Sequence, residues 1–151
     1  GNDTSGSSGS SAAPYAPDEL DPGSYSYSVS GYENTVVMGA YVLYQSIDVE
    51  YVIGFVSGDE RYVVNLMLPK GDLKKGKTTL KAYDQTITPK GPTTAIAINS
   101  FLYLAESGEM VIENDPKTGE ITGTFNFIAR SKDFPDRVVE VAGSMNAIKL
   151  K

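Results

Sequence analysis

The sequence contains no histidine, no cysteine and no tryptophan. Without histidine, the chain lacks the side chain best suited to proton transfer near neutral pH and the commonest imidazole ligand of zinc, copper and iron. Without cysteine it can form no disulfide, no thiolate metal site and no thiol nucleophile. These absences exclude serine–histidine and cysteine–histidine catalysis. We therefore expect a protein that is not an enzyme, with no catalytic residue, no metal site and no cofactor.

Basic residues are missing from the first part of the chain. Residues 1–23 hold four acids and no lysine or arginine, in a segment dominated by Gly, Ser, Ala and Pro, and the whole chain carries a net charge of −6. Such a composition buries too little surface to offset ordering, so we predict a flexible acidic tether over residues 1–23 and a single β domain over residues 24–151. A chain without a basic excess is also not expected to bind nucleic acid.

The sequence also lacks an uninterrupted hydrophobic run that is long enough to span a membrane. The most apolar stretch, residues 36–56, carries Gln45, Ser46, Asp48 and Glu50 at its centre. Polar and charged side chains are costly at that depth in a bilayer. We therefore interpret the stretch as two strands and a turn.

What the chain does contain is ten tyrosines among frequent Val, Ile and Thr, which favours strands. Residues 24–30 alternate as a half-buried strand, and residues 35–45 are apolar on both faces, which predicts a central strand. Residues 94–105 fit a strand or a helix, and we prefer a strand. "DPKTG" predicts a hairpin turn between two C-terminal strands. Together these patterns predict an all-β fold, an antiparallel β-sandwich of about eight to ten strands, with a calycin-like up-and-down β-barrel as the alternative.

The C-terminal strands resemble the end of a family of small exported lipoproteins of Gram-negative bacteria, a family of unknown function. Its pattern is a Gly-Thr-Phe-x-Phe-x-Ala strand followed by a valine-rich strand that ends in Gly-x-Phe. The positions that match are Gly123, Thr124, Phe125, Phe127, Ala129, Val138, Val139, Val141 and Gly143, while Met145 stands where an aromatic residue is usual. The resemblance implies a periplasmic, outer-membrane or cell-surface location and attachment to the membrane through a lipidated cysteine upstream of Gly1.

Acidic residues are the remaining candidates for catalysis. Asp48 and Glu50 lie two apart on one strand face, and a carboxylate pair is the apparatus of a glycoside hydrolase. We favour solvated acids, and keep a carboxylate-only hydrolase as a second functional alternative. It would need two convergent acids among Asp48, Glu50, Asp59, Glu60, Glu106 and Glu109.

Oxygen-bearing turn residues are candidates for calcium binding. They are Glu113, Asn114, Asp115 and Glu120, with Asp133 and Asp136 as a second group. Neither group has the alternating spacing of an EF-hand loop, and such residues are common in turns for conformational reasons. The conformational role is the one we expect.

Lysines and tyrosines are the candidates for ligand contact. The lysines are Lys70, Lys74, Lys75, Lys77 and Lys81. They could meet an acidic glycan or lipid head groups, but protection of a sheet edge is the interpretation that we favour. The tyrosines are Tyr25, Tyr27, Tyr32, Tyr41, Tyr44, Tyr51, Tyr62, Tyr83 and Tyr103. They suit protein, glycan or small hydrophobic ligands, although we expect most of them in the core.

The function that these patterns favour is a non-enzymatic envelope lipoprotein domain with a binding or assembly role. The first alternative is a calycin-like barrel, in which residues 36–44 would line a cavity for a small hydrophobic ligand. Self-assembly by strand addition is a further possibility, and it requires an unpaired sheet edge.

Overall fold

Ten antiparallel strands make up the computed structural model, which describes residues 12–150. Three short 3₁₀ turns accompany them, at Pro17–Glu19, Lys70–Asp72 and Pro116–Thr118. The strands are β1 (Ser24–Gly31), β2 (Thr35–Gly39), β3 (Val42–Ile47), β4 (Glu50–Val56), β5 (Tyr62–Pro69), β6 (Gly76–Leu80), β7 (Thr93–Ile98), β8 (Phe101–Ile112), β9 (Glu120–Ser131) and β10 (Val138–Lys149). The predicted all-β antiparallel fold of eight to ten strands is confirmed.

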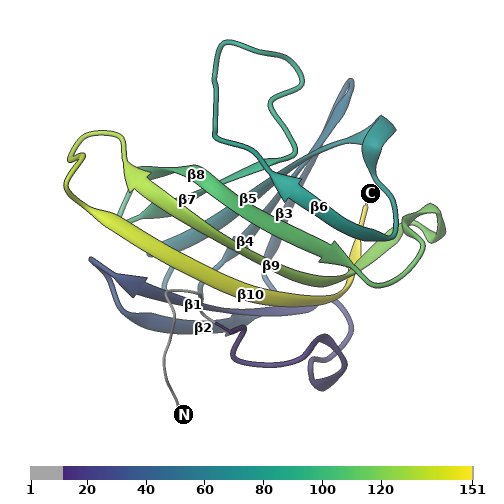
Figure 1. The fold of residues 1–151 in the computed structure, drawn as a ribbon. Coiled ribbons are helices and arrows are strands. Elements are labelled where there is room, and N and C mark those ends of the chain that lie inside the picture. Colours follow the sequence, from purple (N-terminus) through teal and green to yellow (C-terminus); the bar gives the residue numbers. More distant parts are fainter. Residues whose placement is uncertain (1–11, 151) are drawn as a thin grey trace.

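One continuous sheet contains all ten strands. Its order is β2-β1-β10-β9-β8-β7-β5-β4-β3, and β6 pairs with β8 beside β7. Most strands therefore pair with their neighbours in the sequence, as in a meander. The sheet curls into a half barrel, with β8, β9 and β10 on one side of the interior and β3, β4 and β5 on the other (Figure 1).

Hairpin turns connect the predicted strands. The region of ambiguous prediction, residues 94–105, consists of the end of β7, a two-residue turn and the start of β8, so the preference for strand is confirmed. Asn99 and Ser100 both have positive φ, as a tight hairpin turn requires. The predicted "DPKTG" turn is also confirmed: Asp115 accepts a hydrogen bond from the Lys117 amide, and Gly119 takes the left-handed conformation at φ 93°.

The two outer strands of the sheet, β2 and β3, are halves of one chain segment interrupted only by Ala40 and Tyr41. The first half pairs with β1 and the second with β4. Tyrosine hydroxyls of β1 join these two regions across the interior. That of Tyr27 donates to the Phe55 carbonyl at 3.0 Å, and that of Tyr25 donates to the carbonyls of Tyr41 and Val56.

Aromatic rings fill the interior of the curl. Tyr25 stacks on Phe55 at a centroid distance of 4.7 Å, Phe55 on Phe125 at 5.9 Å and Phe125 on Phe127 at 6.5 Å, and all four side chains are buried. Gly143 lies between Tyr27 and Phe125 in the ladder, where a Cβ atom would overlap the Phe125 ring. The two glycine positions of the C-terminal pattern are therefore explained by packing, since a Cβ at Gly123 would likewise strike the Val111 carbonyl.

The segment before β1 packs against the sheet. Pro17 and Leu20 are buried, and two side chains of β10 hold the segment's backbone: Ser144 Oγ donates to the Tyr15 carbonyl at 2.6 Å and Asn146 Nδ2 to the Leu20 carbonyl at 2.7 Å. The part of the predicted tether from residue 12 to residue 23 is thus attached to the domain, because Pro17 and Leu20 are buried against the sheet. Residues 1–11 of that prediction lie outside the described residues.

Removing the Tyr27 hydroxyl tests the hydrogen bond that joins β1 to β4 across the interior. We expect Tyr27→Phe to lower the free energy of unfolding by about 1–3 kcal/mol, because the hydrogen bond to the buried Phe55 carbonyl is lost. The control is Tyr83→Phe, at a half-buried tyrosine outside the core, which should change stability by less than about 0.5 kcal/mol. Urea denaturation measures both, and equal stability of the two variants would contradict the expectation.

Alkaline pH tests the same tyrosines without mutation. Burial raises the pKa of Tyr25 and Tyr27 above the ordinary 10.0, with the neighbouring Tyr25 hydroxyl adding to the effect at Tyr27. The folded state then holds protons that the unfolded state releases above about pH 10, so stability is complete below that pH and falls above it. We expect stability to be constant from about pH 8 to about pH 10 and to decline above it, with each tyrosine adding at most about 1.4 kcal/mol per pH unit, and urea denaturation measures the decline. Tyr27→Phe should show a shallower decline than the wild type, and an identical slope would count against the assignment.

Candidate binding surface

An apolar strip runs along the outside of the segment that forms β2 and β3. Val36 is 62% exposed, Met38 53% and Leu43 50%. We call this surface the edge strip, and its members are Val36, Met38, Tyr41, Leu43, Ile47 and Val49. They account for six of the twelve large hydrophobic side chains that are exposed in residues 12–150, five of them on this segment and Val49 in the turn that follows it.

The strand predicted to be central is therefore at the edge of the sheet, and that prediction is wrong. Residues 35–45 are apolar on both faces, but only the inner face is covered: Val37 is buried and packs in the core, and Val42 is packed partly against it. The outer face has no layer above it within the described chain. A strand with two apolar faces and one covered face is left with hydrophobic surface in contact with water.

Each half of this segment has only one partner strand, and a crevice lies along the free side of each half. The lower crevice, of about 210 Å³, lies between β3 and the end of β10 and is lined by Gly23, Ala40, Val42, Tyr44, Ile148 and Lys149. Tyr44 bridges the two sides, since its hydroxyl donates to the Leu150 carbonyl at 2.6 Å. The upper crevice, of about 270 Å³, lies between β2 and the β4–β5 turn and is lined by residues 35–38, Ser57, Gly58, Asp59 and Tyr62. Both crevices run beside an unpaired strand edge.

The two acids considered as a catalytic pair differ in their surroundings, and only Asp48 is the solvated acid that we expected. Glu50 is buried at the start of β4, and its Oε2 accepts a hydrogen bond from the Gly91 amide at 2.6 Å. Asp48 is exposed in the β3–β4 turn, where its φ is 32°. Glu50 thus fastens the long connection between β6 and β7 to the sheet, and sequence reasoning missed this role because its partner lies 41 residues away.

The other acids proposed for hydrolysis have local partners. Glu106 pairs with Arg130 at 2.8 Å, an interaction that raises the pKa of the guanidinium, and Glu109 pairs with Lys77 at 3.3 Å. Asp59 follows the end of β4, whereas Asp48 precedes its start, so the two acids lie at opposite ends of this strand. A hydrogen bond from Ser57 lowers the pKa of the Asp59 carboxyl. Glu60 is exposed in the same turn.

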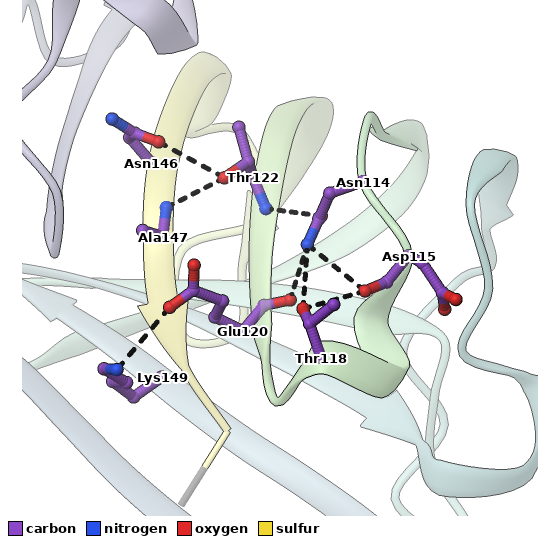
Figure 2. A network of polar contacts seen from close by, with 8 residues as sticks. All are labelled: Asn114, Asp115, Thr118, Glu120, Thr122, Asn146, Ala147 and Lys149. Atoms are coloured by element: carbon purple, nitrogen blue, oxygen red, sulfur yellow. Dashed lines mark hydrogen bonds and ion pairs between the residues drawn. The ribbon is translucent and has the colours of Figure 1, made fainter.

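The first group of turn residues considered for calcium binding forms a hydrogen-bonded turn, shown in Figure 2. Asn114 donates to the Glu120 carbonyl at 2.9 Å and accepts from the Thr122 amide at 3.0 Å. Asp115 caps the 3₁₀ turn, while Glu120 pairs with Lys149 at 3.5 Å. Glu113 is exposed. Across residues 12–150, no three acidic side chains gather as metal ligands.

The second acidic group flanks an aromatic cluster. Asp133 and Asp136 are exposed on the β9–β10 turn. Between them Phe134 lies 4.0 Å from the Arg137 guanidinium, whose other neighbour is the Tyr32 ring at 4.6 Å. These contacts fix the conformation of the turn.

The lysines follow the connection between β5 and β6. Lys74, Lys75, Lys77 and Lys81 are exposed, and Lys70 lies over the Tyr51 ring at 5.2 Å. Most candidate tyrosines are structural, as expected: Tyr25, Tyr27, Tyr62 and Tyr103 are buried, and Tyr44, Tyr51 and Tyr83 are half-buried. Burial raises the pKa of Tyr103. Of the nine candidates, Tyr32 and Tyr41 are exposed, and Tyr41 belongs to the edge strip.

Comparison with known proteins places the chain in no family: no family model, no curated protein and no solved structure matches it. We also find no helix in residues 12–150 with the length and hydropathy of a membrane span. The fold defines the class of this protein as an antiparallel all-β domain with a filled interior. Its exposed apolar edge is the surface that sequence reasoning missed.

Replacing Glu50 tests whether it has a structural role. Glu50→Ala leaves the buried Gly91 amide without an acceptor, and we expect a loss of about 1–3 kcal/mol in the free energy of unfolding, together with faster hydrogen exchange at that amide. Glu50→Gln keeps an acceptor oxygen, so this variant should retain most of the stability and most of the protection of the Gly91 amide from exchange. If the Ala and Gln variants exchange at the same rate as the wild type, Glu50 does not hold this connection.

Proposed function

We propose that this protein is a non-enzymatic binding or assembly domain that docks through the edge strip. The observation that carries the proposal is a segment without charged residues, Thr35 to Ile47, whose apolar outer face is uncovered while the interior is filled. Contiguous apolar surface on a soluble domain marks a contact with another macromolecule. The strip lies beside unpaired strand edges, which favours a protein partner that contributes a strand.

Several observations support a function without catalysis. The chain has neither histidine nor cysteine, and the acids Glu50, Glu106 and Glu109 are each engaged by an amide or a basic side chain. These contacts hold loops and strands in place.

The proposal places the domain in the cell envelope of a Gram-negative bacterium, as an exported lipoprotein. Its support is the C-terminal pattern of Gly123, Phe125 and Phe127 followed by the valine-rich strand that includes Val141. These residues face the core. The pattern therefore supports a family resemblance in architecture, while the docking role rests on the edge strip.

Photo-crosslinking in cells tests the docking role. We expect the full chain with p-benzoylphenylalanine at Leu43 to form discrete adducts on illumination, because Leu43 lies at the centre of the edge strip and is 50% exposed. Gel mobility and mass spectrometry identify each adduct as a second copy of the chain or as another protein.

The control is the same photoreactive residue at Ile128, which is exposed on β9 away from the strip. It should give no discrete adduct. If Leu43 gives no adduct, or if the two positions give the same pattern, the strip is not a docking surface.

A further inference from the structure

Three loops project together from one end of the curled sheet, at the top of Figure 1. They are the β3–β4 turn, the β5–β6 connection and the β6–β7 connection, and we call residues 47–50, 70–75 and 81–92 the loop end. Hydrogen bonds join the loops. The Lys70 amide donates to the Val49 carbonyl at 2.9 Å, and the Gly91 amide donates to Glu50 Oε2 at 2.6 Å. The loop end is therefore one joint surface.

Lysines gather at the loop end, although the chain as a whole is acidic. Residues 70–90 hold six of the thirteen basic residues of the chain and two acids, while the net charge of the chain is −6. Of these six lysines only Lys77 lies within a strand, β6, where it pairs with Glu109 at 3.3 Å. Protection of a sheet edge therefore explains Lys77 alone. The others lie on the loops: Lys70, Lys74, Lys75, Lys81 and Lys90.

Four acids lie among these lysines without neutralising them. Glu50 is buried and bonded to the Gly91 amide. Asp84 accepts hydrogen bonds from the amide and the hydroxyl of Thr86, at 2.9 and 2.6 Å, and these bonds lower the pKa of its carboxyl. Asp48 and Asp72 are exposed. In the described part of the chain, none of the four forms an ion pair with a lysine of the loop end, so the lysines are available to external anions.

Exposed aliphatic side chains lie at the tips of two of these loops. Ile47 is 48% exposed and Val49 43% in the β3–β4 turn, and Ile87 is 38% exposed in the β6–β7 connection. The bonds from Thr86 to Asp84 fix the backbone just before Ile87. Aliphatic tips surrounded by lysines match the boundary of a bilayer, where apolar side chains enter the acyl region and ammonium groups stay among the head groups.

We infer that the loop end docks on an anionic lipid surface, with Ile47, Val49 and Ile87 at the acyl boundary and the lysines at the head groups. An anionic surface attracts each nearby lysine with an energy that corresponds to about fivefold in affinity. An acidic glycan would use the lysines but leave the aliphatic tips in water, so the two features together favour lipid. This contact is separate from the proposed docking role: Ile47 and Val49 end the edge strip, but its centre, Leu43, lies outside the loop end.

Cosedimentation of the full chain with lipid vesicles tests the role of the lysines. We expect binding to vesicles of phosphatidylcholine mixed with phosphatidylglycerol, and little binding to phosphatidylcholine alone. Lys74→Gln combined with Lys75→Gln should raise the dissociation constant about 30-fold. The control combines Arg61→Gln with Lys132→Gln, which removes the same charge from exposed positions at the opposite end of β5. It should change binding less than about twofold, because charges beyond a Debye length are screened.

A single tryptophan tests insertion of the tips, because the native chain contains none. With the mixed vesicles, Ile87→Trp should show a blue shift of its emission and quenching by brominated acyl chains. Ile128→Trp is the matched control, since Ile128 is also 38% exposed but lies on β9, away from the loop end, and its emission should not change. Circular dichroism checks that every variant is folded.

Three results would overturn the inference: no binding to the mixed vesicles, an equal loss of binding in the two double variants, or a tryptophan at position 87 that stays in water. The last result, together with an effect of Lys74 and Lys75, would make the loop end a site for a soluble polyanion instead. Crosslinking from Leu43 reports on the edge strip and is independent of these outcomes, so the two proposals can fail separately.

Discussion

The structure depends on one segment that serves as both edges of the sheet. Thr35 to Ile47 must pair with β1 along its first half and with β4 along its second. Hydroxyls of Tyr25 and Tyr27 hold these regions together by bonding to carbonyls of Tyr41, Phe55 and Val56. Because neither half has a second partner strand, the crevices and the free edges follow from the same arrangement. The exposed apolar surface is thus a consequence of how the sheet curls.

The interior of the curled sheet is filled by aromatic side chains, whereas apolar side chains are exposed on its exterior. Stacked rings of Tyr25, Phe55 and Phe125 occupy the inside, and the glycines at 123 and 143 are needed to admit them. The calycin-like alternative required residues 36–44 to line a cavity for a ligand. In the structure the stacked rings fill that interior space. The proposed docking role therefore concerns the outer surface of the domain.

Local sequence signals predicted local structure well. The alternation of residues 24–30 and the Asp115 to Gly119 turn were sufficient for a strand and a hairpin, because both depend on neighbours in the chain. The Asn99–Ser100 turn carried no glycine and was less clear. The position of residues 35–45 in the sheet was predicted wrongly. Two apolar faces are expected in a strand that is covered on both sides, but they also occur in an edge strand with one exposed apolar face. The Glu50 contact with Gly91 was beyond sequence reasoning because a long connection brings the two together.

The meander order has a consequence for how the chain is made. Every strand except β1 and β10 finds its partners within the neighbouring part of the sequence, whereas the pairing of β1 with β10 joins Ser24 to Asn146. Closing so long a segment costs about 2 kcal/mol more entropy than closing a hairpin of about ten residues. During synthesis β1 emerges from the ribosome first and waits for the last strand. The first and last strands of this sheet in chain order therefore complete it together, and a nascent chain without β10 leaves the edge of β1 unpaired.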